Sequence, residues 1–104
     1  MPVVVVFSTF PSAEAAAEVA RALVSERLVA CVNLVPGVRS IYRWQGELCD
    51  ESEVLAVMKT TEERTGALIA RLSELHPYEV PEALALPVTA GSAKYVAWVA
   101  GETS

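Results

Sequence analysis

The chain has 104 residues, of which 53% are apolar, and this length fits a single domain over residues 1–104. Its formal net charge is −5 and its eight basic residues are scattered, so the sequence lacks the electropositive face that a nucleic-acid partner would need. No apolar run approaches the roughly 18 residues of a membrane helix, and residues 3–7 carry no signal-peptide flanks, so we expect a cytoplasmic protein with no membrane partner.

The first elements along the chain are a predicted strand and a predicted helix. Residues 3–7 form an apolar run, rich in β-branched side chains, that is typical of a strand buried on both faces. Ser12 is a good N-cap for the alanine-rich helix that follows, which we expect to end at Glu26 or Arg27. This helix has one apolar stripe of mostly small residues that can lie close to a sheet: Ala16, Val19, Ala20, Leu23 and Val24.

A long hairpin is predicted next. Residues 30–44 and 47–60 read as two strands joined by a two-residue turn at Gln45-Gly46. Proline cannot donate to a strand ladder, so Pro36-Gly37 predicts a bulge or kink in the first of them.

The two cysteines are too far apart in this hairpin to form a disulfide. With the turn at 45–46, Cys49 faces Tyr42 and Cys31 faces Thr60. The thiols are then roughly 36 Å apart along the ribbon, far beyond disulfide reach. The absence of a CxxC pair also argues against a zinc finger or a redox pair.

The second half of the chain predicts another helix. Thr60 and Glu63 match a capping box, followed by a helix over about 62–75. We expect His76 to end it, because a residue before proline disfavours helical geometry. Its apolar face comprises Leu68, Ile69, Leu72 and Leu75.

The last predicted elements complete a recognisable order. Residues 83–90 read as an apolar strand and 92–100 as a short helix capped by Ser92. The order β-α-β-β-α-β predicts an α+β, ferredoxin-like split βαβ sandwich with an extra C-terminal helix and a long hairpin between its second and third strands.

The predicted strands carry more apolar surface than one subunit can cover. Residues 3–7, 54–58 and 83–88 are apolar on both faces instead of alternating with polar residues. If such a face were exposed to solvent, its apolar area would exceed that of the patches usual on monomers. The hairpin 38–52 is also long enough to extend past the sheet and contact a neighbouring subunit. We therefore expect an obligate homo-oligomer.

Specific motifs cover nearly the whole chain: RLVACVNLVPGVRSIYRWQGEL, LAVMKTTEE, LHPYEVPEALALPVTAG and YVAWV. Together they resemble the CutA family of divalent-cation tolerance proteins. The resemblance implies a homotrimer of ferredoxin-like subunits whose hairpins reach onto neighbours. The family is similar in architecture to the PII signalling proteins, which bind small molecules in clefts between subunits.

The resemblance also implies metal ligands. The copper ligands ascribed to the family's bacterial prototype are a cysteine and two adjacent histidines, which fall on Ser8, Leu75 and His76 here. Only His76 retains a donor, whereas copper(II) favours several nitrogen or sulfur donors. Cys31 matches another cysteine typical of the family, so the metal candidates are His76 and Cys31, for copper or another divalent cation. The alternatives are a helix-terminal histidine and a buried, inert thiol.

Lys59, at the end of an apolar strand, needs a partner for its charge. We expect Glu82 or Glu47 to supply it, in one chain or between two. Together with Tyr78 these residues predict either an intersubunit pocket for a small molecule or a structural ion pair.

Large aromatic side chains near the hairpin turn, Trp44 and Tyr42, are predicted at the trimer interface, because such side chains carry interface energy.

Two functions follow from these expectations. The first is a trimeric, cytoplasmic divalent-cation tolerance protein that binds copper or other metal ions weakly or at subunit interfaces. The alternative is a PII-like small-molecule sensor or assembly scaffold for which metal is incidental. We do not expect an enzyme, because the single histidine would have to carry all proton transfer and the five glycines are isolated.

Overall fold

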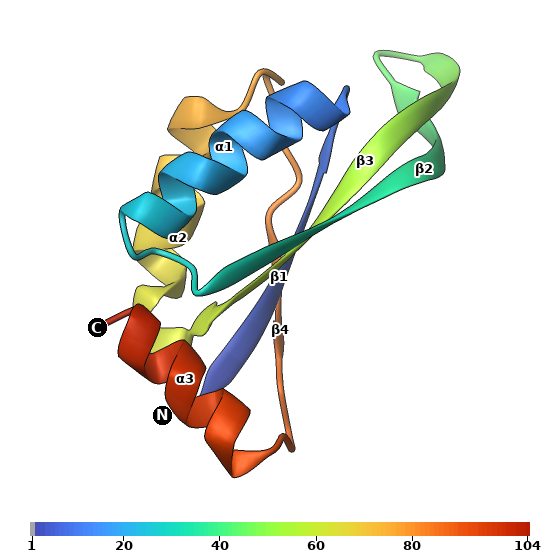
Figure 1. Ribbon diagram of the computed structural model, residues 1–104. Coiled ribbons are helices and arrows are strands. Elements are labelled where there is room, and N and C mark those ends of the chain that lie inside the picture. The colour runs from blue at the N-terminus through green and yellow to red at the C-terminus, as the bar shows by residue number, and fades with distance from the viewer. Residues whose placement is uncertain (1) are drawn as a thin grey trace.

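The computed structural model describes residues 2–104 and shows an α+β fold built on one four-stranded sheet (Figure 1). In chain order its elements are β1 (Val3–Phe10), α1 (Ala13–Ser25), β2 (Cys31–Trp44), β3 (Glu47–Thr61), α2 (Glu62–Leu75), β4 (Leu84–Pro87) and α3 (Ala93–Glu102). The strand order is β2-β3-β1-β4 and each neighbouring pair is antiparallel. The predicted ferredoxin-like class, with its long β2–β3 hairpin and extra helix, is confirmed.

Helix α1 follows its predicted start closely. The Ser12 hydroxyl accepts a hydrogen bond from the Ala15 N–H at 3.1 Å, which satisfies one of the free donors of the first turn. The helix buries Ala16 and Leu23 as expected, but Val24 is 43% exposed, so its place in the predicted stripe is wrong. The stripe that faces the sheet is narrower than the apolar pattern suggested.

The hairpin turn forms at the predicted residues. Gln45 and Gly46 both have positive φ, 50° and 81°, as a two-residue type I′ turn requires. Cys49 pairs with Tyr42, as predicted. Both cysteines are free thiols.

A bulge at Pro36-Gly37 changes the pairing of the inner half of the hairpin. Val35 faces Leu55 and Val38 faces Glu53, so β2 carries one residue more than β3 between these pairs. Cys31 therefore faces Lys59, and the predicted pairing of Cys31 with Thr60 is wrong by one position.

Helix α2 ends as predicted but begins differently. Thr60 lies fully buried in β3, where its hydroxyl donates to the Leu28 carbonyl at 2.7 Å. The predicted capping box of Thr60 with Glu63 is therefore wrong, and Thr61 takes the N-cap position without a side-chain cap bond. His76 is the C-cap, as the following proline predicted.

The main core lies between the sheet and helices α1 and α2, which lie side by side on one face (Figure 1). Its largest fully buried side chains come from the sheet and from both helices: Val6, Phe10, Leu23, Met58, Leu68 and Leu72. Helix α3 lies across the end of the sheet where β1 begins, with Val99 packed against Val3 and Ala30.

The opposite side of the sheet, here called the open face, is largely uncovered in one chain. Cross-strand pairing places apolar side chains in rows across it: Val5, Phe7, Val35, Leu55, Val57, Leu84 and Leu86. Leu84 is 60% exposed and Leu86 43%. Strand β4 is shorter than the predicted 83–90 and ends at Pro87, although the Val88 N–H still donates to the Val3 carbonyl at 3.0 Å. No helix within residues 2–104 is long and apolar enough to span a membrane.

Candidate functional site

Both ring nitrogens of His76 are engaged by the backbone. Nδ1 accepts a hydrogen bond from the Tyr78 N–H at 3.1 Å, and Nε2 lies 2.8 Å from the Thr9 carbonyl oxygen. Because an N–H can only donate and a carbonyl can only accept, the proton of the neutral ring is on Nε2. A metal ion at His76 would have to displace one of these two bonds.

The surroundings of His76 keep it neutral. The side chain is only 7% exposed, stacks on Phe10 with ring centroids 4.2 Å apart, and contacts the ring of Tyr78 at 4.8 Å. Burial lowers the pKa of His76, although the Thr9 carbonyl and the Glu53 carboxylate act in the opposite direction. His76 thus joins the end of α2 to the end of β1 as an uncharged ring.

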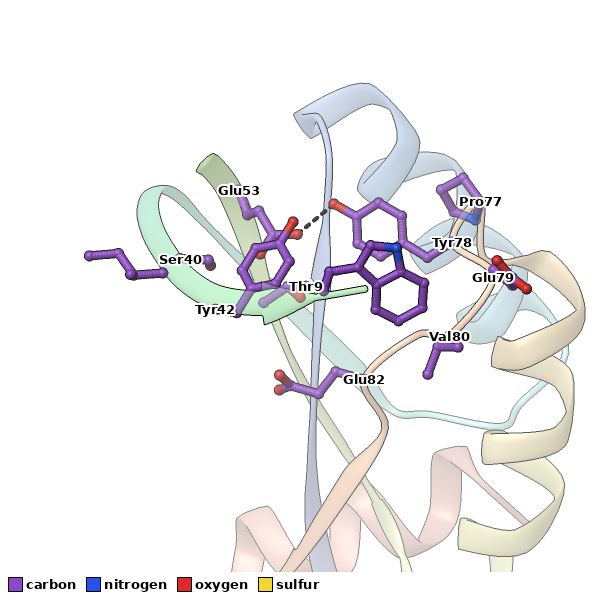
Figure 2. A pocket seen from close by; sticks show the side chains of 11 residues that line it. Thr9, Ser40, Tyr42, Glu53, Pro77, Tyr78, Glu79, Val80 and Glu82 are labelled. Atoms are coloured by element: carbon purple, nitrogen blue, oxygen red, sulfur yellow. Dashed lines mark hydrogen bonds between the residues drawn. The ribbon is translucent and has the colours of Figure 1, made fainter. Parts of the chain in front are cut away.

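A cavity of about 650 Å³ opens beside this junction, between the outer hairpin and the segment 77–82 that leads into β4 (Figure 2). Figure 2 shows Tyr42 and Glu53 on its hairpin side and Glu79 and Val80 across from them. The lining is aromatic and acidic: Tyr42, Trp44, Tyr78, Glu53, Glu79 and Glu82, completed by Thr9, Ser40, Ile41, Pro77 and Val80.

Two phenol–carboxylate hydrogen bonds order the cavity and its margin. The Tyr78 hydroxyl donates to Glu53 Oε2 at 2.5 Å, and the Tyr42 hydroxyl donates to Glu51 Oε1 at 3.2 Å. Burial and the adjacent carboxylates raise the pKa of Tyr78 and raise that of Tyr42 to about 12. Both phenols therefore stay protonated at neutral pH and act as donors.

The structure brings four of the predicted site residues together in this cavity: Tyr42, Trp44, Tyr78 and Glu82. It does not bring Lys59 there. The Lys59 ammonium donates to the Asn33 side-chain oxygen, and within residues 2–104 it forms no ion pair with Glu82 or Glu47. The ion pair expected within one chain is therefore wrong, because the pairing of β3 places Lys59 opposite Cys31 and far from the hairpin turn.

The two predicted metal ligands lie on different sides of the sheet. His76 packs on Phe10 in the helix layer, whereas Cys31 lies beside Lys59 on the open face, with its Sγ 3.7 Å from the Asn33 oxygen. Among the residues that the structure describes, no three or more His, Cys, Asp or Glu side chains are grouped so that they could hold a metal ion.

Glu53 is the most buried of the charged site residues that the sequence did not reveal. It stands in an acidic run with Asp50 and Glu51, and nothing in that run sets it apart. Its position directly after the bulge, opposite Val38, was the available signal, because bulges re-aim side chains beside functional sites.

Comparison with known proteins places the fold and the sequence in one family. A family described as "CutA1 divalent ion tolerance protein" matches residues 4–102. The "Divalent-cation tolerance protein CutA" of Thermus thermophilus is 50% identical over 99 residues, which are 95% of this chain and 96% of that protein. The chloroplastic protein CutA of Arabidopsis thaliana is 42% identical over 99% of this chain, which spans 57% of that longer relative.

Solved structures agree with this relationship. The crystal structure of CutA from Xylella fastidiosa has a TM-score of 0.95 at 42% identity, with 98% of each chain covered. That of CutA1 from Oryza sativa has a TM-score of 0.96 at 40% identity, covering all of this chain and 95% of the other. The chain belongs to the CutA1 family of divalent-ion tolerance proteins.

Proposed function

We propose that this chain acts as a homotrimeric, non-enzymatic divalent-cation tolerance protein that binds metal ions weakly, through donors at subunit interfaces. The observation that carries the proposal is the open face. In one chain this face exposes the apolar side chains of Leu84 and Leu86 to solvent, which is unfavourable. A neighbouring subunit would cover them.

The edges of the sheet support a closed ring. β2 and β4 are the two outer strands, and they differ in length and sequence. Contact between unlike edges of neighbouring subunits is head-to-tail, which produces a ring when the rotation closes. Tyr42 and Trp44, 39% and 41% exposed near the hairpin turn, are the aromatic side chains that we propose as contacts to the next subunit.

A first test is the mass of the protein in solution. We expect sedimentation velocity at micromolar concentration to give about three times the chain mass of 11.1 kDa. Leu84→Glu should raise the dissociation constant at least about a hundredfold, because it places an unpaired charge in the interface. Val24→Glu, a matched change of an exposed apolar residue in the helix layer, should leave the mass unchanged. A monomeric native protein would overturn the proposal.

The metal component rests on the placement of the donors. Both nitrogens of His76 are already hydrogen-bonded, whereas Cys31 is a free, half-buried thiol on the face that we propose lies between subunits. A thiolate is a soft donor that suits zinc(II) as well as copper, and association could bring it near donors of another subunit. We also propose a cytoplasmic location, which two free thiols favour.

A copper titration tests this assignment. We expect calorimetry of the native trimer to show weak binding that Cys31→Ser reduces several-fold and His76→Asn leaves unchanged. Asn keeps an acceptor for the Tyr78 N–H, so the variant removes the imidazole without abandoning that bond. Tight binding at one ion per chain that His76→Asn abolishes would show instead that the metal displaces the backbone partners of His76.

A second candidate function is supported by the cavity. Its volume of about 650 Å³ lies within the range of small-molecule sites, and it is apolar with a few polar groups, as such sites are. The protein would then be a PII-like sensor of a small ligand, with metal binding incidental to that role.

A further inference from the structure

The cavity carries negative charge that no basic side chain among its described lining residues balances. Three glutamates line it, Glu53, Glu79 and Glu82, and none of the described lining residues is Lys, Arg or His. Glu53 is only 7% exposed, and its hydrogen-bond partner is a neutral phenol, that of Tyr78. A buried carboxylate is costly unless a cation pairs with it, so the cavity favours a positively charged occupant.

The walls around this carboxylate are aromatic. Tyr42, Trp44 and Tyr78 line the cavity together with Glu53. The faces of such rings attract cations through their quadrupoles, and aromatic cages are the usual receptors for alkylated ammonium groups. The hydroxyl of Tyr78 is held by the carboxylate and stays protonated, so the phenol adds no second negative charge.

An organic cation fits this lining better than a metal ion. Hard divalent ions take about six or more oxygen ligands, and within residues 2–104 no three His, Cys, Asp or Glu side chains, the three glutamates of the cavity included, are grouped so that they could hold a metal ion. Side chains such as Pro77, Ile41 and Val80 offer no ligands but do offer apolar contact. The volume of about 650 Å³ is also far larger than one ion needs.

We propose that the cavity binds an organic ammonium cation with an apolar body, with its charge beside Glu53 and its body against Tyr42 and Trp44. This proposal rests on the second candidate function, a small-ligand sensor, and names the chemical class of its ligand. It does not require the metal component of the first.

The first experiment compares a cation with its uncharged counterpart. Choline and 3,3-dimethyl-1-butanol have the same shape, and only choline carries a charge. Calorimetric titration of the native oligomer should show choline binding at one site per chain, about tenfold or more tighter than the alcohol. Equal affinity for the two compounds would overturn the proposal.

Variants locate the site. Glu53→Gln keeps an acceptor for the Tyr78 hydroxyl but removes the charge, and should weaken choline binding about tenfold. Glu82→Gln, at a half-buried position in the same cavity, should weaken choline binding several-fold. It keeps the test decisive if Glu53→Gln misfolds. Glu102→Gln is the matched control, since α3 lies at the other end of the sheet (Figure 1). Binding that both cavity variants leave unchanged, while they remain folded by circular dichroism, would also overturn the proposal.

Two competing occupants give different results. If manganese(II) displaces choline at one ion per chain and Glu53→Gln abolishes manganese binding, the cavity is a metal site and the proposal fails. If choline does not bind and Glu53→Gln loosens the oligomer in sedimentation, the counter-charge belongs to a basic side chain of a neighbouring subunit, and the proposal fails. Tyr42 and Trp44, which we propose as contacts to the next subunit, also line the cavity, so the neighbouring subunit would lie at its margin. Sedimentation of the same samples separates these outcomes from a failure of the trimer itself, because it reports the oligomeric state whether or not choline binds.

Discussion

Phe10→Ala is expected to destabilise the protein by about 3–5 kcal/mol, the range found when a fully buried aromatic side chain is truncated. Phe10 is 1% exposed and belongs to the core beneath α1 and α2. Its ring also supports His76, on which it stacks at 4.2 Å. The variant therefore leaves a cavity in the core and removes the surface that holds the imidazole in place.

Urea unfolding at one fixed protein concentration measures this loss, because the stability of an oligomer depends on concentration. Phe10→Leu is the control. It keeps most of the volume and should cost less than about 1.5 kcal/mol. A loss below about 1 kcal/mol for Phe10→Ala would mean that the ring is not packed as described.

His76→Ala is expected to cost about 2–4 kcal/mol, because it leaves two buried backbone groups without their partner. The Tyr78 N–H loses its acceptor and the Thr9 carbonyl loses its donor. His76→Asn, which can still accept from the Tyr78 N–H, should lose less than His76→Ala. Equal losses for the two variants would argue that the ring packing, and not the hydrogen bonds, is what His76 contributes.

The same residue makes stability depend on pH. The pKa of His76 is lowered in the folded state, so below its ordinary value of 6.5 the unfolded chain binds a proton that the folded chain refuses. The contribution of the neutral imidazole to the free energy of unfolding is complete above that value. It falls on acidification by at most about 1.4 kcal/mol per pH unit, until the pH passes the lowered pKa. Unfolding measured between about pH 7.5 and 5.5 should show this slope in the native protein and not in His76→Asn. A native protein with flat stability across this interval would contradict the assignment.

Local signals in the sequence were sufficient for most of the fold. Ser12 could be read as a cap because its hydroxyl needs only the N–H three residues on, and Gln45-Gly46 as a turn because it needs only two positive φ angles. The end of α2 at His76 follows from the ring of the next proline. Each of these effects acts within a few residues and is the same in any fold.

The candidate site could be predicted only in part, because its contacts join distant segments. Tyr78 and Glu82 were recognised as pocket residues, but the partner of Tyr78 is Glu53, 25 residues earlier in the chain. The charge of Lys59 alone predicted a carboxylate partner, whereas in the sheet its ammonium group donates a hydrogen bond to the side chain of Asn33. Such contacts depend on the pairing register of the strands, which a single extra residue alters.

That extra residue, in the bulge at Pro36-Gly37, decides whether β2 presents aromatic or basic side chains to the cavity. Side chains alternate along a strand, and after the bulge it is the even-numbered residues of β2 that share the face of Glu53: Ser40, Tyr42 and Trp44. Without it, the odd-numbered residues of the same stretch, Arg39, Ile41 and Arg43, would take that face. Two guanidinium groups would then replace two aromatic rings, and they would offset two of the three glutamate charges that line the cavity. The lining of the cavity in this chain therefore depends on the number of residues before the turn as much as on their identity. A one-residue deletion at this bulge would change the specificity of the cavity more than any single substitution in it.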